Sequence, residues 1–145
     1  MNGILLDTNV ISELRKVNAG RADPQVAQWA AGVQTSQLYL SVITVQELEM
    51  GILLRERRDT QQGAALRLWF ERQVLPTFAG RILPVTLAVA RQCAALNLPD
   101  PKPERDGLIA ATALVHNLMM ATRNTKDFQG TGVQLLNPWQ SDTIH

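Results

Sequence analysis

Hydrophobic residues along the chain follow two patterns that alternate. Short apolar runs bounded by polar or turn residues predict buried strands at residues 4–6, 38–43, 82–85, 118–121 and 133–136. Longer stretches with apolar residues at helical spacing predict helices at residues 10–16, 24–31, 45–57, 62–77, 87–96 and 105–117. Strands that alternate with helices predict an α/β fold with a central, mostly parallel sheet of about five strands and helices on both faces.

Four acidic residues stand where such a sheet would gather them at one edge. Asp7 follows the first apolar run directly, Asp127 comes soon after the fourth, and Glu47 and Asp106 lie near the starts of predicted helices. In parallel α/β sheets the site lies beyond the carboxyl ends of the strands, where the strand order reverses. Carboxylates that are brought together without a cation repel each other. The cluster therefore predicts a divalent metal at an all-oxygen site, and hydrolysis is the commonest use of such a metal.

Each acid also has a structural alternative. Thr44 and Glu47 match a capping box, in which Glu47 bonds back to the Thr44 backbone. Asp106 could complement a helix dipole, and Asp127 could be a turn or cap residue. Asp7 could cap the following helix, although an acid that ends an apolar strand is costly without a partner. Four independent caps need not converge on one sheet edge, so the combination favours a site.

Composition sets the class of protein. A chain of 145 residues, 46% apolar and 19% charged, fits one folded domain over residues 1–145. The formal net charge of +1 gives no overall basic field, so polyanion binding must come from local arginines and lysines. A lone cysteine, Cys93, is typical of a buried residue in a reducing compartment. With no signal peptide and no apolar run of bilayer length, we expect a cytoplasmic protein with no membrane partner.

Other chemistries have weaker support. His116 and His145 are the only histidines, which disfavours a histidine-based zinc site or a triad, and no phosphate-binding glycine loop is present. Basic residues close in sequence to Asp7 and Asp127 could hold phosphates, although most surface arginines are simply solvated. The candidate RNA-binding residues are Arg15, Lys16, Arg123 and Lys126.

Four motifs carry a family resemblance. The segments LLDTNVISEL, QELEMGI, DGLIAATA and TRNTKDF occur in this order from Asp7 to about Pro138. Together they resemble the PIN-domain ribonucleases, and more narrowly the VapC-type toxins of type II toxin–antitoxin systems, including the FitB-like branch. Any one motif would be weak, but four in the correct order at full-domain length are specific.

The resemblance implies a PIN fold with an acidic pocket that holds Mg²⁺ or Mn²⁺. It assigns three catalytic and metal-binding acids, with supporting polar residues beside them, and leaves open whether Asn124 or Asp127 fills the fourth position. An asparagine there would add no charge, so the strength of a second metal site stays open as well. The acids are Asp7, Glu47, Asp106 and, with that alternative, Asp127; the supporting residues are Thr8, Asn9, Thr122 and Asn124.

The implied activity is metal-dependent hydrolysis of RNA phosphodiester bonds by an endoribonuclease, with tRNA or rRNA loops as targets. Glu47 or Asp106 could serve as general base, and the sequence does not choose between them. The implied partner is a VapB- or FitA-like antitoxin, which would also bind operator DNA for the complex. The resemblance further implies a homodimer.

Two other functional classes compete with the nuclease. A PIN-like dimer without catalysis could act with a DNA-binding antitoxin in transcriptional autoregulation, but an unused acidic cluster would only destabilise its fold. A phosphoacceptor receiver domain is also α/β with acids at strand ends. It would need paired acids after the first strand and a lysine after the last, and the segments DTN and LLNP supply neither.

Overall fold

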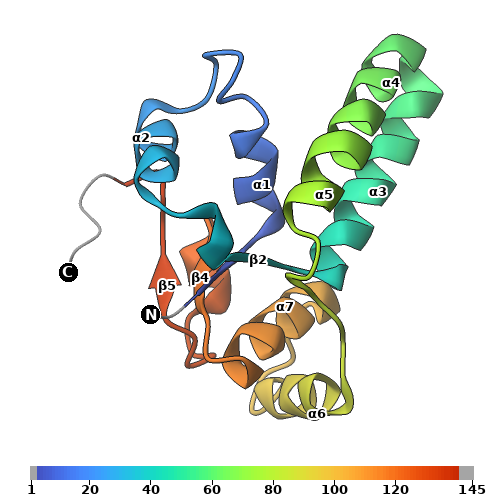
Figure 1. The fold of residues 1–145 in the computed structure, drawn as a ribbon. Coiled ribbons are helices and arrows are strands. Elements are labelled where there is room, and N and C mark those ends of the chain that lie inside the picture. The colour runs from blue at the N-terminus through green and yellow to red at the C-terminus, as the bar shows by residue number, and fades with distance from the viewer. Residues whose placement is uncertain (1–2, 141–145) are drawn as a thin grey trace.

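The computed structural model describes residues 3–140 and contains, within them, a five-stranded parallel sheet flanked by helices (Figure 1). The predicted fold class is therefore confirmed. The ends of the expected domain over residues 1–145, including His145, lie outside the described residues. The strands are β1 (Ile4–Leu6), β2 (Leu38–Ser41), β3 (Ile82–Leu83), β4 (Met119–Ala121) and β5 (Leu135–Leu136).

The helices follow the predicted spacing, with one interruption. The predicted helix at residues 62–77 is divided by a π-helical turn at Phe70–Val74. Pro76, just beyond this turn, lacks the backbone N–H that a regular helix would use. The α-helices are α1 (Thr8–Leu14), α2 (Pro24–Gly32), α3 (Val42–Arg58), α4 (Thr60–Trp69), α5 (Leu75–Thr77), α6 (Leu87–Leu96) and α7 (Glu104–Val115). None of them, over residues 3–140, is long and apolar enough to cross a membrane.

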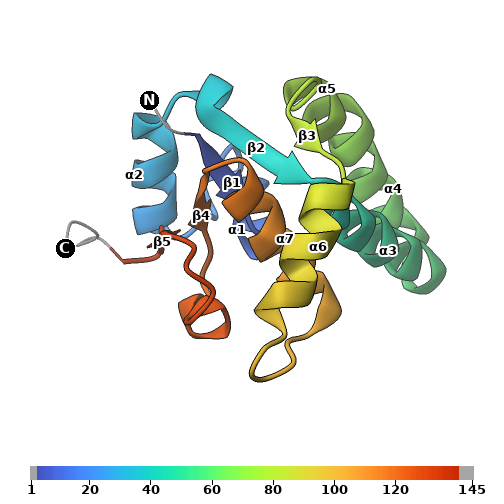
Figure 2. The ribbon, with the colours of Figure 1, turned by 90° about the horizontal axis from the view of Figure 1, so that it is seen from below.

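The sheet separates two hydrophobic cores. Leu5 of β1 faces the core that α6 and α7 cover, whereas its neighbour Leu6 faces the core beneath α1 and α3. Met120 and Ala121 of β4 divide between the two cores in the same way. This alternation follows from the period of two along a strand, and it confirms helices on both faces (Figure 2).

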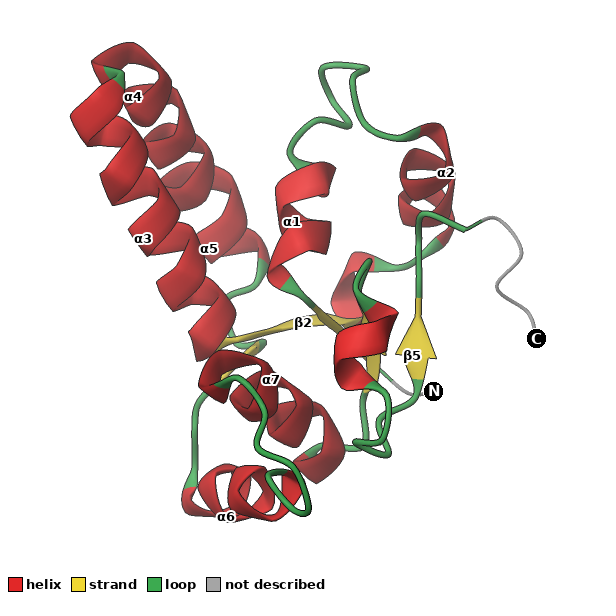
Figure 3. Ribbon diagram, turned by 180° about the vertical axis from the view of Figure 1, so that it is seen from behind, coloured by secondary structure: helices red, strands yellow, loops and turns green. Residues whose placement is uncertain are grey.

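Helices α3 and α4 form an antiparallel hairpin that stands beside the sheet (Figure 3). A Cβ atom at Gly63 would lie 2.5 Å from the Cα of Glu56, so only glycine permits this close approach of the two helices. Thr8, Glu47 and their neighbours lie where α1 and the base of this hairpin meet the sheet edge.

The strand order β3-β2-β1-β4-β5 reverses direction at β1. The chain runs outward from β1 through β2 to β3 and then returns to β4 on the other side of β1. Past the carboxyl end of β1, the backbone N–H of Asp7 donates to the carbonyl of Ala121 at 2.9 Å. The first and fourth motifs therefore meet at the switch point, where ligands bind in folds of this kind.

Candidate active site

Asp7 is fixed in place by several donors. It is 7% exposed and caps α1, with Oδ1 accepting the Thr8 backbone N–H at 2.8 Å. Its Oδ2 accepts the hydroxyl of the fully buried Thr122 at 2.7 Å and the Asn9 Nδ2 at 3.4 Å. The Thr122 oxygen in turn accepts the Asn124 backbone N–H at 3.0 Å. Residues from both ends of the chain thus orient one carboxylate, which both caps a helix and faces a pocket.

Glu47 is held by a neighbouring helix rather than by its own. The Thr8 hydroxyl donates to Glu47 Oε1 and also lies 3.4 Å from Thr44 Oγ1. The capping box considered for Thr44 and Glu47 is wrong, because α3 begins earlier. Ser41 caps this helix by accepting the Ile43 backbone N–H at 3.0 Å. Glu47 is therefore free of a capping role.

Asp106 lies half-buried in the first turn of α7. The small residues Ala110, Ala111 and Ala113 that follow it are buried, and the close contact at Gly107 is with another helix. A Cβ atom at Gly107 would lie 3.1 Å from the Sγ of Cys93 in α6. The preceding residue, Arg105, places Nη1 3.5 Å from Glu47 Oε2. An arginine that the sequence analysis did not single out thus contributes to the site.

These side chains surround an open pocket of about 390 Å³ at the edge of the sheet. Asp127, in contrast, is exposed on the 3₁₀ turn Thr125–Phe128 and is not a lining residue. Thr122 is fully buried and contacts the lining through Asp7, to which its hydroxyl donates, and through the backbone N–H of Asn124, which its oxygen accepts. The lining residues are Asp7, Thr8, Asn9, Glu47, Arg105, Asp106 and Asn124.

The pKa of Asp7 is raised above its usual value. Burial is the main cause, since a carboxylate loses its water there. Hydrogen bonds from Thr122 and Thr8 act in the opposite direction, and the negative charges of Glu47 and Asp127 raise the pKa further. The acids are therefore close enough to repel one another.

The pKa of Asp106 is raised for similar reasons. Burial is again the largest cause, followed by the charges of Asp7, Asp127 and Glu47, while Arg105 lowers it. Asp127 acts on both Asp7 and Asp106 although it does not line the pocket. A mobile cation would relieve the same repulsion more completely than one arginine does.

The donor chemistry of the pocket fits a hard divalent cation, because every candidate ligand is an oxygen. The side chains as they stand are more dispersed: over residues 3–140, no three acids, histidines or cysteines are grouped closely enough to hold a metal. Glu47 is engaged by Thr8 and Arg105 instead. Metal binding would thus require a change of side-chain rotamers, which Glu47 can make at low cost because its side chain is long and partly exposed.

The predicted RNA-binding residues lie around this pocket but not in its lining. Arg15 and Lys16 line an adjoining groove. Arg123 and Lys126 are exposed, and the Arg123 guanidinium stands 5.2 Å from the centre of the Trp139 ring. Trp29, Trp69 and Trp139 pack against the core beneath α1 and α3, and Cys93 is buried and free.

Comparisons with known proteins agree with this geometry. The PIN domain family model matches residues 4–133. The chain is 41% identical to VapC ribonuclease Y4jK of Sinorhizobium fredii, covering 94% of this chain and 98% of the relative. It is 39% identical to the toxin FitB of Neisseria gonorrhoeae, with the same two coverages, 94% and 98%. A solved structure of FitAB bound to the IR36 DNA fragment superposes with a TM-score of 0.86 at 36% identity, covering 98% and 99% of the two chains. The chain therefore belongs to the PIN-domain family and, within it, to the group of VapC- and FitB-type toxins.

Proposed function

We propose that the chain is a metal-dependent endoribonuclease and the toxin of a toxin–antitoxin pair. One observation carries the proposal: Asp7, Glu47 and Asp106 line one pocket at the topological switch point, where burial and then repulsion among the acids raise the pKa of Asp7 and of Asp106. Such an arrangement destabilises a fold unless a cation or a substrate uses it. A nuclease that cuts a phosphodiester binds both a divalent cation and a substrate in its pocket.

The residues that would hold the ion are Asp7, Glu47 and Asp106, with Asp127 or Asn124 in the fourth position. When bound, Mg²⁺ or Mn²⁺ would supply positive charge that makes water more acidic and offsets charge on the phosphate. Thr122 and Thr8 orient the Asp7 and Glu47 carboxylates by donating their hydroxyl hydrogens. Their contribution is to hold the acids in position.

Asp106 is the better of the two candidate bases. Glu47 already accepts a hydrogen bond from Thr8 and pairs with Arg105, whereas Asp106 forms no ion pair with a basic residue among residues 3–140. In this account Asp106 takes the proton from the attacking water as the water oxygen bonds to phosphorus. The bond from phosphorus to the leaving ribose oxygen then breaks, and that oxygen takes up a proton.

The substrate is single-stranded or looped RNA, because a pocket this shallow at a sheet edge must receive a backbone that is splayed away from a helix. Loops of tRNA or rRNA satisfy that requirement. The pocket is open to solvent, with Asn124 and Arg105 among its lining residues, so an RNA strand can enter and leave it.

The partner is an antitoxin that blocks the pocket and carries the DNA-binding function of the complex. The similar FitB chain is found with its partner on DNA in the FitAB structure. With a net charge of +1 the present chain is a weak DNA ligand by itself, so operator binding would pass through the antitoxin. We further propose that the chain is a homodimer.

The test is to incubate the antitoxin-free protein with total tRNA and rRNA, with Mg²⁺ and with EDTA, beside the Asp106→Asn variant. We expect discrete cuts that require Mg²⁺ and disappear in the variant. Cutting that persists in EDTA or in Asp106→Asn would contradict the metal-dependent mechanism. The absence of cutting by a folded, metal-loaded protein would contradict the nuclease itself.

A further inference from the structure

A groove of about 290 Å³ continues from the acidic pocket, between α1 and the α3–α4 hairpin. Thr8 and Glu47 line both hollows, so the groove and the pocket adjoin each other. Leu66 and Trp69 of α4 contribute apolar surface on the far side. A polymer bound in the pocket could therefore extend directly into this groove.

The groove carries more positive than negative charge, since three basic residues and two acids, Glu13 and Glu47, line it. Arg15 and Lys16 follow the end of α1, and Arg55 lies on α3 across from them. Lys16 pairs with Glu13 at 3.2 Å, but neither Arg15 nor Arg55 forms an ion pair with any acid among residues 3–140. Within the described part of the chain, the guanidinium of Arg55 donates to the neutral Gln62 side chain alone, at 2.5 Å. Two cations thus remain available to an anion beside the acidic pocket.

We propose that this groove holds the RNA strand on one side of the cleaved phosphate, with Arg55 and Arg15 contacting its phosphates. The inference rests on the proposed function and adds a direction to it. The acids mark the place of the scissile phosphate. The cations beside them attract the neighbouring phosphates of the strand, which the acids alone would repel. Trp69 offers an aromatic surface on which a base can stack, whatever its sequence.

Helix geometry provides a matched control. Glu47, Gly51 and Arg55 are spaced by four residues and line the groove together. Arg57, two residues further along the same helix, is exposed, has no acidic partner over residues 3–140, and points away from that face. Arg55 and Arg57 therefore share charge, helix and exposure but differ in their position relative to the groove.

The first experiment measures binding of a fluorescein-labelled single-stranded RNA of about 12 nucleotides by fluorescence anisotropy. The protein carries Asp106→Asn so that the RNA stays intact, and each variant is checked for folding by thermal unfolding. We expect Arg55→Gln to weaken binding roughly three- to tenfold and to lower the slope of log affinity against log salt by about 0.7, the value for one lost phosphate contact. Arg57→Gln should change neither.

A second pair of variants compares a charged with a neutral side chain in the groove, at a position where a side chain does not disturb the fold. A Cβ atom at Gly51 would meet no heavy atom within 4 Å, so a side chain there extends into open space. Gly51→Glu and Gly51→Gln have nearly the same size and differ in charge. If RNA runs through the groove, Gly51→Glu binds more weakly than Gly51→Gln, and the difference shrinks at high salt.

Equal RNA affinities for Arg55→Gln and Arg57→Gln, or for the two Gly51 variants, would overturn the inference and leave the groove to a polypeptide such as the antitoxin. The nuclease is judged separately, from cleavage by the protein with Asp106 intact. Loss of the groove effect with cleavage preserved refutes only the RNA path, whereas absent cleavage refutes the proposed function.

Discussion

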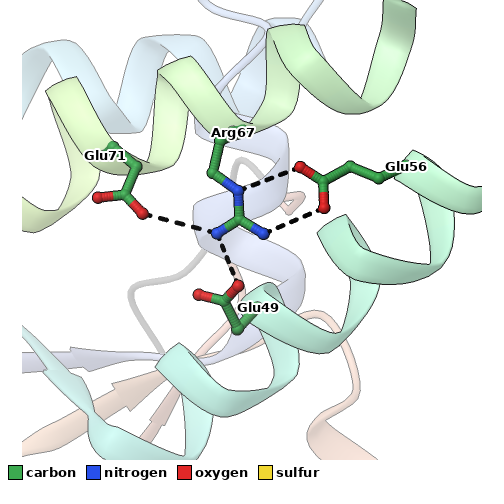
Figure 4. A network of polar contacts seen from close by, with 4 residues as sticks. All are labelled: Glu49, Glu56, Arg67 and Glu71. Carbon is green, nitrogen blue, oxygen red and sulfur yellow. Dashed lines mark hydrogen bonds and ion pairs between the residues drawn. The ribbon is translucent and has the colours of Figure 1, made fainter. Parts of the chain in front are cut away.

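Two groups of acids in this protein differ in whether they share a basic partner. On the α3–α4 hairpin, Arg67 is surrounded by three glutamates (Figure 4). Its Nη1 lies 2.6 Å from Glu49 and 3.6 Å from Glu71, and its Nε lies 3.2 Å from Glu56. Hydrogen bonds to Glu56 and Glu49 raise the pKa of the guanidinium. Arg67 thus pairs with all three glutamates, and its contacts with Glu49 and Glu56 link α4 to α3.

At the sheet edge the acids lack such a cation. Among residues 3–140, Arg105 pairs with Glu47 alone, at 3.5 Å, and burial together with repulsion among the acids raises the pKa values of Asp7 and Asp106. Carboxylates alone therefore do not identify a site. Acids that all pair with one arginine are structural, whereas acids in a pocket that still repel one another are a candidate for binding a cation.

The largest expected difference between the groups is in activity. Asp7→Asn removes a charge at the pocket and should reduce RNA cleavage by roughly 100-fold or more. Glu49→Gln removes a charge from the hairpin group and should leave the rate unchanged. The measurement is the initial rate of RNA cleavage by each variant. A similar loss in both variants would mean that the acids act only through the stability of the fold.

A smaller loss is expected from the residue that orients Asp7. Thr122→Val removes the hydroxyl bonded at 2.7 Å, which should lower the cleavage rate by about 10- to 100-fold. The matched control is Thr131→Val, which removes a buried hydroxyl that donates to the Phe128 carbonyl at 2.6 Å and is not bonded to Asp7, Glu47 or Asp106. If Thr131→Val lowers the rate as much, the effect of Thr122 is not one of positioning.

Arg105 competes with a metal for Glu47 in this account, unlike Arg67, which is fully engaged. Arg105→Gln should therefore tighten Mn²⁺ binding by about threefold, a modest effect because the pair is partly exposed. Mn²⁺ titration monitored by electron paramagnetic resonance measures this directly. Arg123→Gln serves as the control for a general change in charge, and an equal gain in that variant would remove any specific role of Arg105.

The raised pKa of Asp106 predicts a change in stability with pH. A folded-state pKa above 3.8 means that protonation favours the fold below about that pH, and that this stabilisation is lost as pH rises through the raised value. At neutral pH Asp106→Asn should therefore raise the melting temperature by roughly 2–4 °C, with the gain shrinking towards pH 3.8. Asp59→Asn, at an exposed helix cap, should show no such gain. A gain for Asp106→Asn that did not change with pH would contradict the raised pKa of this carboxyl.

The smallest effect is expected at the acids that pair with Arg67. Arg67→Gln leaves its glutamates without their cation and should lower the melting temperature by roughly 1–3 °C, less at high salt, because the group is exposed. Cleavage per folded molecule should stay constant. A loss of activity at constant fold would mean that the hairpin group belongs to the function.

Much of the fold could be predicted from local patterns. The strand Ile4–Leu6 and the helix Leu87–Leu96 begin and end where predicted, because each has a clear period and clear boundaries. The second strand was predicted two residues too long, since an apolar run does not reveal that Ser41 caps the next helix. The π-helical turn within the predicted helix at residues 62–77 also has no signal in hydrophobic spacing.

The site was predictable where strand ends determine it. Asp7 ends an apolar strand, so sheet topology alone places it at the switch point. The contact of Thr8 with Glu47 and the ion pair of Arg105 with Glu47 join residues that are far apart in sequence, and no local pattern encodes them. For Glu47 the local pattern was misleading, because the capping box it resembles does not form.

The most direct test of the account is calorimetric titration of Mn²⁺ into the antitoxin-free protein, its Asp7→Asn variant and its Glu49→Gln variant. The central claim is that the acids at the sheet edge need a divalent cation and the acids around Arg67 do not. We predict saturable binding to the wild type and to Glu49→Gln, and strongly weakened binding to Asp7→Asn. Undiminished binding to Asp7→Asn, or no saturable binding to the folded wild type, would contradict the claim.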